Sequence, residues 1–140
     1  MPEESTTPDL LELGRRIFDA GRRADVDGLV GFYRSDVVIE MSDAALMFEG
    51  STEIRRFYED FFGLWEDLVS ELEELLDLGN GVTFSVIHHR GRPVGSTAEA
   101  QQRLAWVATW QEYKITRVAI YVDIDDGRAI AERLAKERAG

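Results

Sequence analysis

Apolar residues near the start of the chain recur with helical spacing. From Leu10 they lie three and four positions apart as far as Gly21, which predicts an amphipathic helix, and a shorter helix follows a capping Asp25. Residues 1–8 are mostly polar, contain two prolines and show no periodicity. They predict a disordered tail in front of a single domain that spans residues 9–140.

The middle of the chain alternates between strand and helix signals. Residues 37–41 are rich in β-branched side chains and predict a strand, with residues 45–48 pairing to it as a short hairpin. A helix then runs to about Trp65. Its apolar face consists of Ile54, Phe57, Tyr58, Phe61, Phe62 and Trp65. A face this wide and aromatic predicts packing against a sheet.

Residues 68–78 have an ambiguous pattern. Four leucines in this segment match helical spacing, whereas Gly79, Asn80 and Gly81 indicate a hairpin turn, and the pattern alone slightly favours a helix. Three later segments have the composition of strands: residues 82–87, 99–111 and 114–122. A last helix follows at residues 129–138. Helices gathered before such a meander predict an α+β domain with an antiparallel sheet.

Composition and charge narrow the classes of partner and site. The chain has 27 acidic and 16 basic residues, so its net charge of −11 repels nucleic acids and anionic membranes. It has no cysteine, which excludes disulfides, thiolate metal sites and cysteine nucleophiles. No apolar stretch has the length of a signal sequence or a membrane span. We expect a cytoplasmic protein.

Four segments together resemble SnoaL-like and other NTF2-like domains: residues 32–40, 48–58, 103–107, and 114–118 before Asp123. The resemblance covers nearly the whole chain. It implies a cystatin-like cone, in which a curved antiparallel sheet carries the N-terminal helices and a C-terminal helix around one pocket. It also makes residues 68–78 a strand. This superfamily contains both enzymes and binding modules, so the fold alone does not decide the function.

The resemblance also locates three positions that carry chemistry in the related steroid isomerase. Met41 stands at the position of the catalytic base, Ile17 at that of the oxyanion tyrosine and Trp106 at that of the oxyanion aspartate. Methionine cannot accept the proton, isoleucine cannot donate a hydrogen bond, and an indole N–H is only a weak neutral donor. Ile120 likewise replaces the last-strand aspartate of the related epoxide hydrolases. Neither mechanism is available to this chain.

Strand alternation predicts an apolar pocket floor. Leu104, Trp106, Ala108 and Trp110 point to one side of their strand, and Thr116, Val118, Ile120 and Val122 point to the same side of the next. Trp106 and Trp110 share this face and could sandwich a flat ligand. Candidate ligand-binding residues are Ile17, Tyr33, Met41, Tyr58, Trp106, Trp110, Val118 and Ile120. The alternative for all of them is ordinary core packing.

Two residues are candidates for a catalytic base. His88 shares its parity with Phe84 and Val86, so it is the preferred pocket-facing histidine. Glu40 lies on the first strand, where burial against apolar rings would raise the pKa of its carboxyl group. His88 and His89 are adjacent on a strand and face opposite sides, so we expect no metal site. No cofactor motif is present.

These observations predict a domain that binds a small apolar or aromatic molecule without a cofactor, and without nucleic acid or membrane as a partner. The alternative is a cyclase-, isomerase- or hydratase-like enzyme that uses His88 or Glu40 as its base. A third possibility is an interaction module that forms a homodimer through an open sheet face, because an exposed apolar face needs covering.

Overall fold

The computed structural model describes residues 9–139, and the predicted tail at residues 1–8 lies outside this range. The helices within it are α1 (Leu10–Arg22), α2 (Val26–Val30), α3 (Gly50–Gly63) and α4 (Ile124–Ala139). The strands are β1 (Tyr33–Met41), β2 (Leu46–Glu49), β3 (Trp65–Gly79), β4 (Val82–Pro93), β5 (Ala100–Gln111) and β6 (Lys114–Tyr121). Among these described residues, no helix combines the length and the apolar character needed to cross a membrane.

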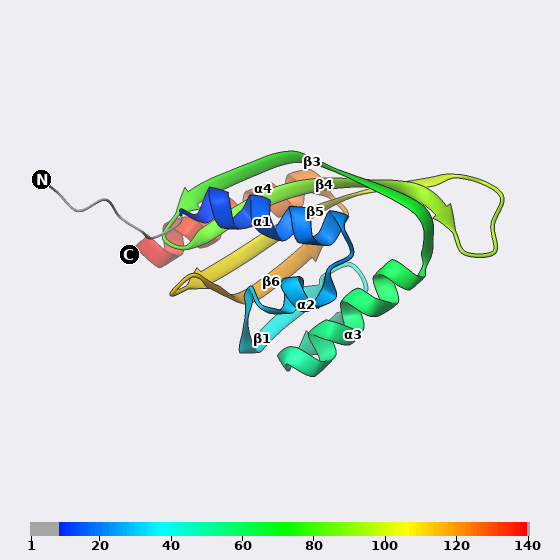
Figure 1. Ribbon diagram of the computed structural model, residues 1–140. Coiled ribbons are helices and arrows are strands. Elements are labelled where there is room, and N and C mark those ends of the chain that lie inside the picture. Colours follow the sequence, from blue (N-terminus) through cyan, green and yellow to red (C-terminus); the bar gives the residue numbers. More distant parts are fainter. Residues whose placement is uncertain (1–8, 140) are drawn as a thin grey trace, which may run out of the picture.

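The strands form one curved sheet in the order β2-β1-β6-β5-β4-β3 (Figure 1). Four of the five pairings are antiparallel, as predicted. The exception is β1, which runs parallel to β6 with Ile39 opposite Val118 and Met41 opposite Ile120. The expected α+β class is therefore confirmed, but the sheet is mixed. β1 and β6 can run parallel because β2, α3 and three further strands lie between them in the chain, so no hairpin joins the pair and reverses its direction.

β3 explains why residues 68–78 carry a helical pattern. The segment is a strand paired with β4, as the family resemblance implied, and its register shifts between Leu72 and Glu74. Such a bulge inserts one extra residue and moves the following side chains to the other face. Leu72 and Leu75 consequently line the same cavity although they are three positions apart. A bulged strand therefore reproduces the spacing of a helix.

The helices cover both faces of the sheet. α1, α2 and α3 lie over its inner face, and α4 lies across β4 and β5 on the outer face (Figure 1). A core beneath α4 contains Val82, Phe84, Val86, Ala105, Val107, Ala131 and Ala135. Gly127 lets α4 approach this closely, because a Cβ atom there would lie 2.9 Å from the Cβ of Ala105.

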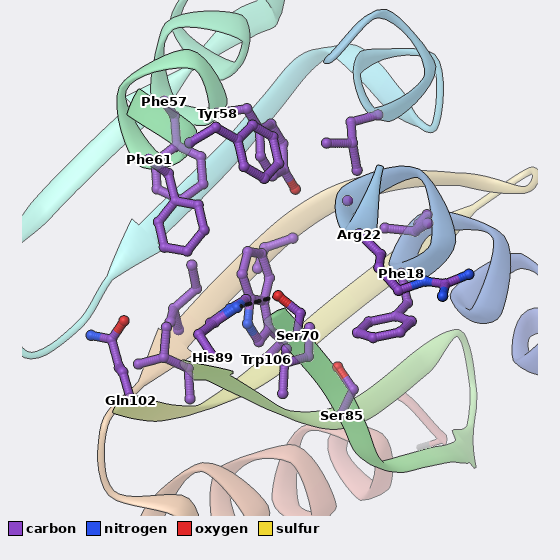
Figure 2. Close-up of a pocket in the computed structure, with 18 of the residues that line it drawn as sticks. Phe18, Arg22, Phe57, Tyr58, Phe61, Ser70, Ser85, His89, Gln102 and Trp106 are labelled. Atoms are coloured by element: carbon purple, nitrogen blue, oxygen red, sulfur yellow. Dashed lines mark hydrogen bonds between the residues drawn. The ribbon is translucent and has the colours of Figure 1, made fainter. Parts of the chain in front are cut away.

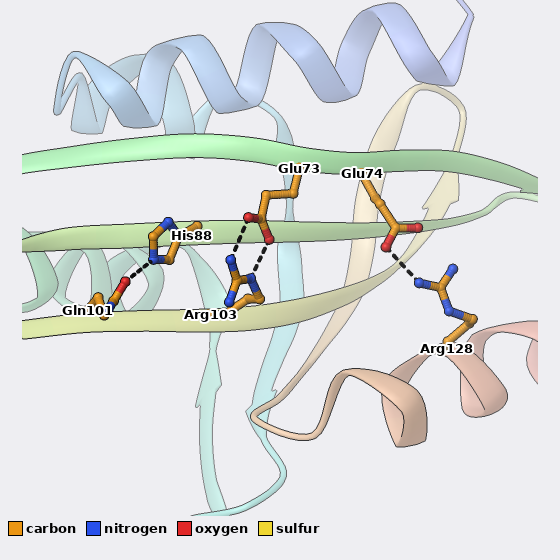
Figure 3. A network of polar contacts seen from close by, with 6 residues as sticks. All are labelled: Glu73, Glu74, His88, Gln101, Arg103 and Arg128. Carbon is orange, nitrogen blue, oxygen red and sulfur yellow. Dashed lines mark hydrogen bonds and ion pairs between the residues drawn. The ribbon is translucent and has the colours of Figure 1, made fainter.

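Beside α4, the outer face of the sheet carries side chains joined by hydrogen bonds and ion pairs (Figure 3). Glu73 on β3 accepts a 2.7 Å hydrogen bond from Arg103 on β5, and His88 Nε2 lies 2.8 Å from Gln101 Oε1. Arg128 on α4 lies 2.6 Å from Glu74. These side chains occupy the sheet face away from α1–α3, so the edge strand β3 presents charges to solvent there. Charged side chains on an edge strand disfavour its pairing with another chain.

Candidate functional site

A cavity of about 780 Å³ lies between the inner sheet face and helices α1 to α3 (Figure 2). Its volume is in the range of cavities that hold small organic ligands. The eight candidate ligand-binding residues all line it: Ile17, Tyr33, Met41, Tyr58, Trp106, Trp110, Val118 and Ile120. Whether they contact a ligand stays a prediction. The alternation of β5 and β6 supplies the floor, since Trp106 stands opposite Ile120 and Ala108 opposite Val118.

The aromatic face of α3 forms the opposite wall. Phe57, Tyr58 and Phe61 project from this helix toward the sheet in Figure 2. The rings of Tyr58 and Phe62 stack with centroids 6.1 Å apart, and the ring of Phe61 lies 5.0 Å from the imidazole of His89. Helical spacing of three and four places these rings on one face, as the sequence predicted. The wall is therefore continuous from α3 to β4.

Tyr33 and Tyr58 form a buried polar pair in this wall. Each residue is 6% exposed, and the two hydroxyl groups are hydrogen-bonded to each other. Burial raises the pKa of Tyr33 to about 12 and that of Tyr58 well above its ordinary value, so both phenols are neutral at physiological pH. Two hydroxyl groups carry two protons, and one hydrogen bond uses one of them. The second has no acceptor among the residues that the structure describes.

His89 is the histidine that faces the cavity. It is 7% exposed, and its Nδ1 atom lies 2.7 Å from the hydroxyl oxygen of Ser70 on the neighbouring strand β3 (Figure 2). Burial, together with the neighbouring His88, lowers the pKa of His89 to about 4, so the ring is neutral near pH 7. No described residue hydrogen-bonds to its Nε2 atom, and this atom is not fully buried. A neutral imidazole can donate or accept there, depending on its tautomer.

The prediction that His88 faces the pocket is wrong. His88 does share its parity with Phe84 and Val86, but these two residues pack beneath α4 on the outer face. Ile87 and His89 line the cavity instead. Both faces of β4 are apolar, so parity grouped the residues correctly without showing which group pointed inward.

Glu40 also lies outside the cavity. Its neighbours Ile39 and Met41 pack against the inner core, so Glu40 points to the outer face. Its side chain is 34% exposed and lies 3.4 Å from the guanidinium of Arg117. It is therefore an outer-face ion-pair partner and not a base in the cavity.

The positions singled out by the resemblance do line the cavity, and they bring no carboxylate into it. Ile17 and Met41 contribute only apolar surface. Trp106 carries a buried Nε1 atom without a hydrogen-bond partner in the described part of the chain. Trp110 differs, since its Nε1 atom donates a 2.9 Å hydrogen bond to Thr83. The two indoles thus share a face but have different polar environments.

Several polar lining residues were missed by sequence reasoning. Ser70, Ser85 and Gln102 line the cavity, and Arg22 and Asp60 bring charges to it. Ser70 stands opposite His89 in the β3–β4 register, a pairing that the bulges in β3 conceal in the sequence.

Among residues 9–139, no group of three or more His, Asp or Glu side chains is placed to hold a metal ion.

The sequence matches the family model of the SnoaL-like domain over residues 14–130, which is most of the chain. The chain belongs to this family. A search of curated protein sequences gave no significant match. The family assignment and the cone-shaped arrangement agree with the fold that the sequence resemblance implied.

Solved structures show the same SnoaL-like, NTF2-like fold. A proposed SnoaL-like polyketide cyclase from Shewanella putrefaciens superimposes with a TM-score of 0.70 at 12% identity, covering 92% of this chain and 88% of its own. A protein with a ketosteroid isomerase-like fold from Catenulispora acidiphila, in complex with trimethylamine, gives 0.71 at 14%, covering 83% and 86%. TerC, co-crystallised with polyporic acid, gives 0.69 at 13%, covering 86% and 96%. At these identities the likeness establishes the fold alone.

Proposed function

We propose that this SnoaL-like domain binds a small, largely apolar molecule that presents a carbonyl oxygen to the Tyr33–Tyr58 pair. The observation that supports this most directly is the O–H proton that the pair leaves without an acceptor. A ligand carbonyl supplies the missing acceptor, and both phenols stay neutral at physiological pH, so the donor is always present.

The apolar lining accounts for most of the expected affinity. Removing apolar ligand surface from water is favourable by about 25 cal/mol per Å², whereas a neutral hydrogen bond contributes about 0.5–1.5 kcal/mol. The tyrosine pair therefore selects and orients a ligand that the aromatic walls hold. Two structural neighbours, in complex with trimethylamine and polyporic acid, are consistent with small organic ligands in proteins of this fold.

Two probes of the same shape test this proposal. Fluorenone carries a ketone and fluorene does not, so their affinities, measured by quenching of tryptophan fluorescence, isolate the hydrogen bond. We expect wild type to bind fluorenone about five times more tightly than fluorene, in line with one neutral hydrogen bond. The Tyr33→Phe, Tyr58→Phe double variant removes both hydroxyls and should bind the two probes equally.

Each outcome decides a different part of the proposal. If neither probe binds, the cavity is not a site for apolar ligands. If the double variant still prefers fluorenone, the tyrosine pair is not the donor. Each single variant keeps one tyrosine hydroxyl with its proton. A single variant that still prefers fluorenone to fluorene shows that its remaining hydroxyl faces the ligand.

A second candidate function is proton transfer at His89. The open Nε2 atom in a ligand-sized cavity favours it, and the neighbouring Ser70 hydroxyl fixes the ring. A base with a pKa of about 4 removes only relatively acidic protons, so the substrate would be an activated ketone. Deuterium exchange at the α carbon of 2-tetralone, followed by NMR, tests this. His89→Gln should abolish any acceleration and His88→Gln should retain it, whereas a wild-type rate equal to that of buffer rejects the activity.

The cytoplasmic location and the homodimer stay predictions. Light scattering distinguishes the monomer mass of 15.9 kDa from twice that value.

A further inference from the structure

Arg22 lines the cavity although its side chain is largely exposed, so the cavity reaches the protein surface between α1 and β3, and we call this place the opening. A shallow pocket on the surface between these elements shares Phe18, Arg22, Ser70 and Leu72 with the cavity wall. In Figure 2, Phe18 and Arg22 extend from α1 on the far side of the cavity from Gln102. A ligand that fills the cavity can therefore extend a substituent to the surface at this opening.

Arg22 gives the opening a positively charged side chain. Among the described residues that line the cavity, it is the one arginine or lysine. Its Nη2 atom lies 2.6 Å from Asp19 Oδ1 one turn earlier on α1, and its side chain is 60% exposed. Such an exposed pair is weak, and the guanidinium has further N–H donors that this contact does not use.

The other groups at the opening are nearly balanced in charge. Arg15 on α1 makes no hydrogen bond or ion pair with the residues the structure describes, whereas Glu71 on β3 and Asp19 are acidic. Asp60, the acidic residue of the main cavity wall, does not line this opening. Two arginines thus face two carboxylates here, in a chain whose net charge is −11. The opening is less acidic than the molecule as a whole.

We propose that the ligand carries a carboxylate, which Arg22 binds at the opening between α1 and β3. The inference rests on the proposed binding of an apolar, carbonyl-bearing molecule in the cavity and adds the chemistry of its other end. The planar guanidinium matches a carboxylate with parallel N–H donors, and Arg15 adds a second positive charge. The ligand class is therefore a hydrophobic keto acid, with its ketone at the tyrosine pair and its acid at the surface.

Fluorenone-2-carboxylate and fluorenone-2-carboxamide test this by differing only in charge. Arg23 provides a matched control, because it also pairs with Asp19, at 3.3 Å, but does not line the cavity. We expect wild type to bind the carboxylate about five times more tightly than the amide at low salt, as for a charge-assisted contact at an exposed site. Arg22→Gln should remove this preference and Arg23→Gln should keep it. Asp19→Asn should increase it, since the aspartate competes for Arg22.

The possible results separate this inference from the binding proposal. If wild type binds acid and amide equally, or if Arg23→Gln lowers the preference as much as Arg22→Gln, Arg22 is not a carboxylate anchor and the cavity proposal stands. If neither compound nor fluorenone binds, both proposals fail together. Melting curves confirm that each variant folds, which is expected because all three side chains are exposed or partly exposed.

Discussion

The hydroxyl group of Tyr33 on β1 is hydrogen-bonded to that of Tyr58 on α3. The contact joins the sheet to the helix that covers it, and both residues are buried in the wall of the cavity. A buried hydroxyl without a partner costs more than the net value of the bond it has lost. The pair therefore has consequences for stability as well as for binding.

We expect the stability effects of the two tyrosines to be strongly coupled. Tyr33→Phe and Tyr58→Phe each leave the other hydroxyl without its hydrogen-bond partner, so each should lower the free energy of unfolding by about 1–2 kcal/mol. The double variant should lose less than the sum, because no polar group is left unpaired. Urea unfolding of all four proteins measures this. Additive losses would show that the hydroxyls do not depend on each other.

His89 should make the protein less stable in mild acid. Its folded pKa of about 4 lies below the unfolded value of 6.5, so the unfolded chain takes up the proton first as the pH falls. The contribution is fully present above pH 6.5 and is lost progressively between pH 6.5 and about 4, with a slope of up to about 1.4 kcal/mol per pH unit.

NMR titration of the imidazole signals checks this assignment directly. The chain has two histidines, so a His88→Gln variant leaves a single signal, that of His89. We expect this signal to titrate well below pH 6.5, because burial, the larger cause of the lowered pKa of His89, is unchanged in this variant. A midpoint near 6.5 would mean that the imidazole is not buried in the folded protein.

Trp106 and Trp110 should respond differently to the same substitution. Trp110→Phe removes the donor to Thr83, whose side chain is itself buried, so it should destabilise the fold by about 1–2 kcal/mol. Trp106→Phe removes an indole N–H that has no partner in the described structure, from a ring that borders a cavity. We expect it to be the milder variant by about 1 kcal/mol in thermal or urea unfolding. Equal losses would indicate that the Trp106 N–H has a partner.

Much of the fold could be predicted from periodicity and turn signals, because most elements bury one side. β5 shows this clearly, since alternation placed Trp106 and Trp110 on the cavity side. In β6 the prediction held for Val118 and Ile120 only, because the register shift opposite Trp110 brings Ile115 to the cavity in place of Thr116, and Val122 lies beyond the strand. β3 could not be predicted by pattern because its bulge between Leu72 and Glu74 changes the alternation. Only the resemblance to a known family identified it as a strand.

The candidate site was less predictable because its polar groups depend on how the elements meet. β4 is buried on both faces, so the sequence could not distinguish the environment of His88 from that of His89. Tyr33 and Tyr58 were expected in the wall, but their hydrogen bond depends on where α3 crosses the sheet. Arg22 appeared as an ordinary residue of an amphipathic helix until α1 was placed beside β3.

The parallel contact between β1 and β6 affects how the chain folds. Residue 39 of β1 pairs with residue 118 of β6, so most of the sequence must be in place before this contact can form. The β3–β6 meander is built from sequential hairpins, which close short loops and form early. We expect the meander to act as a template onto which β1 and the N-terminal helices dock. The binding cavity would then be completed in the last step of folding.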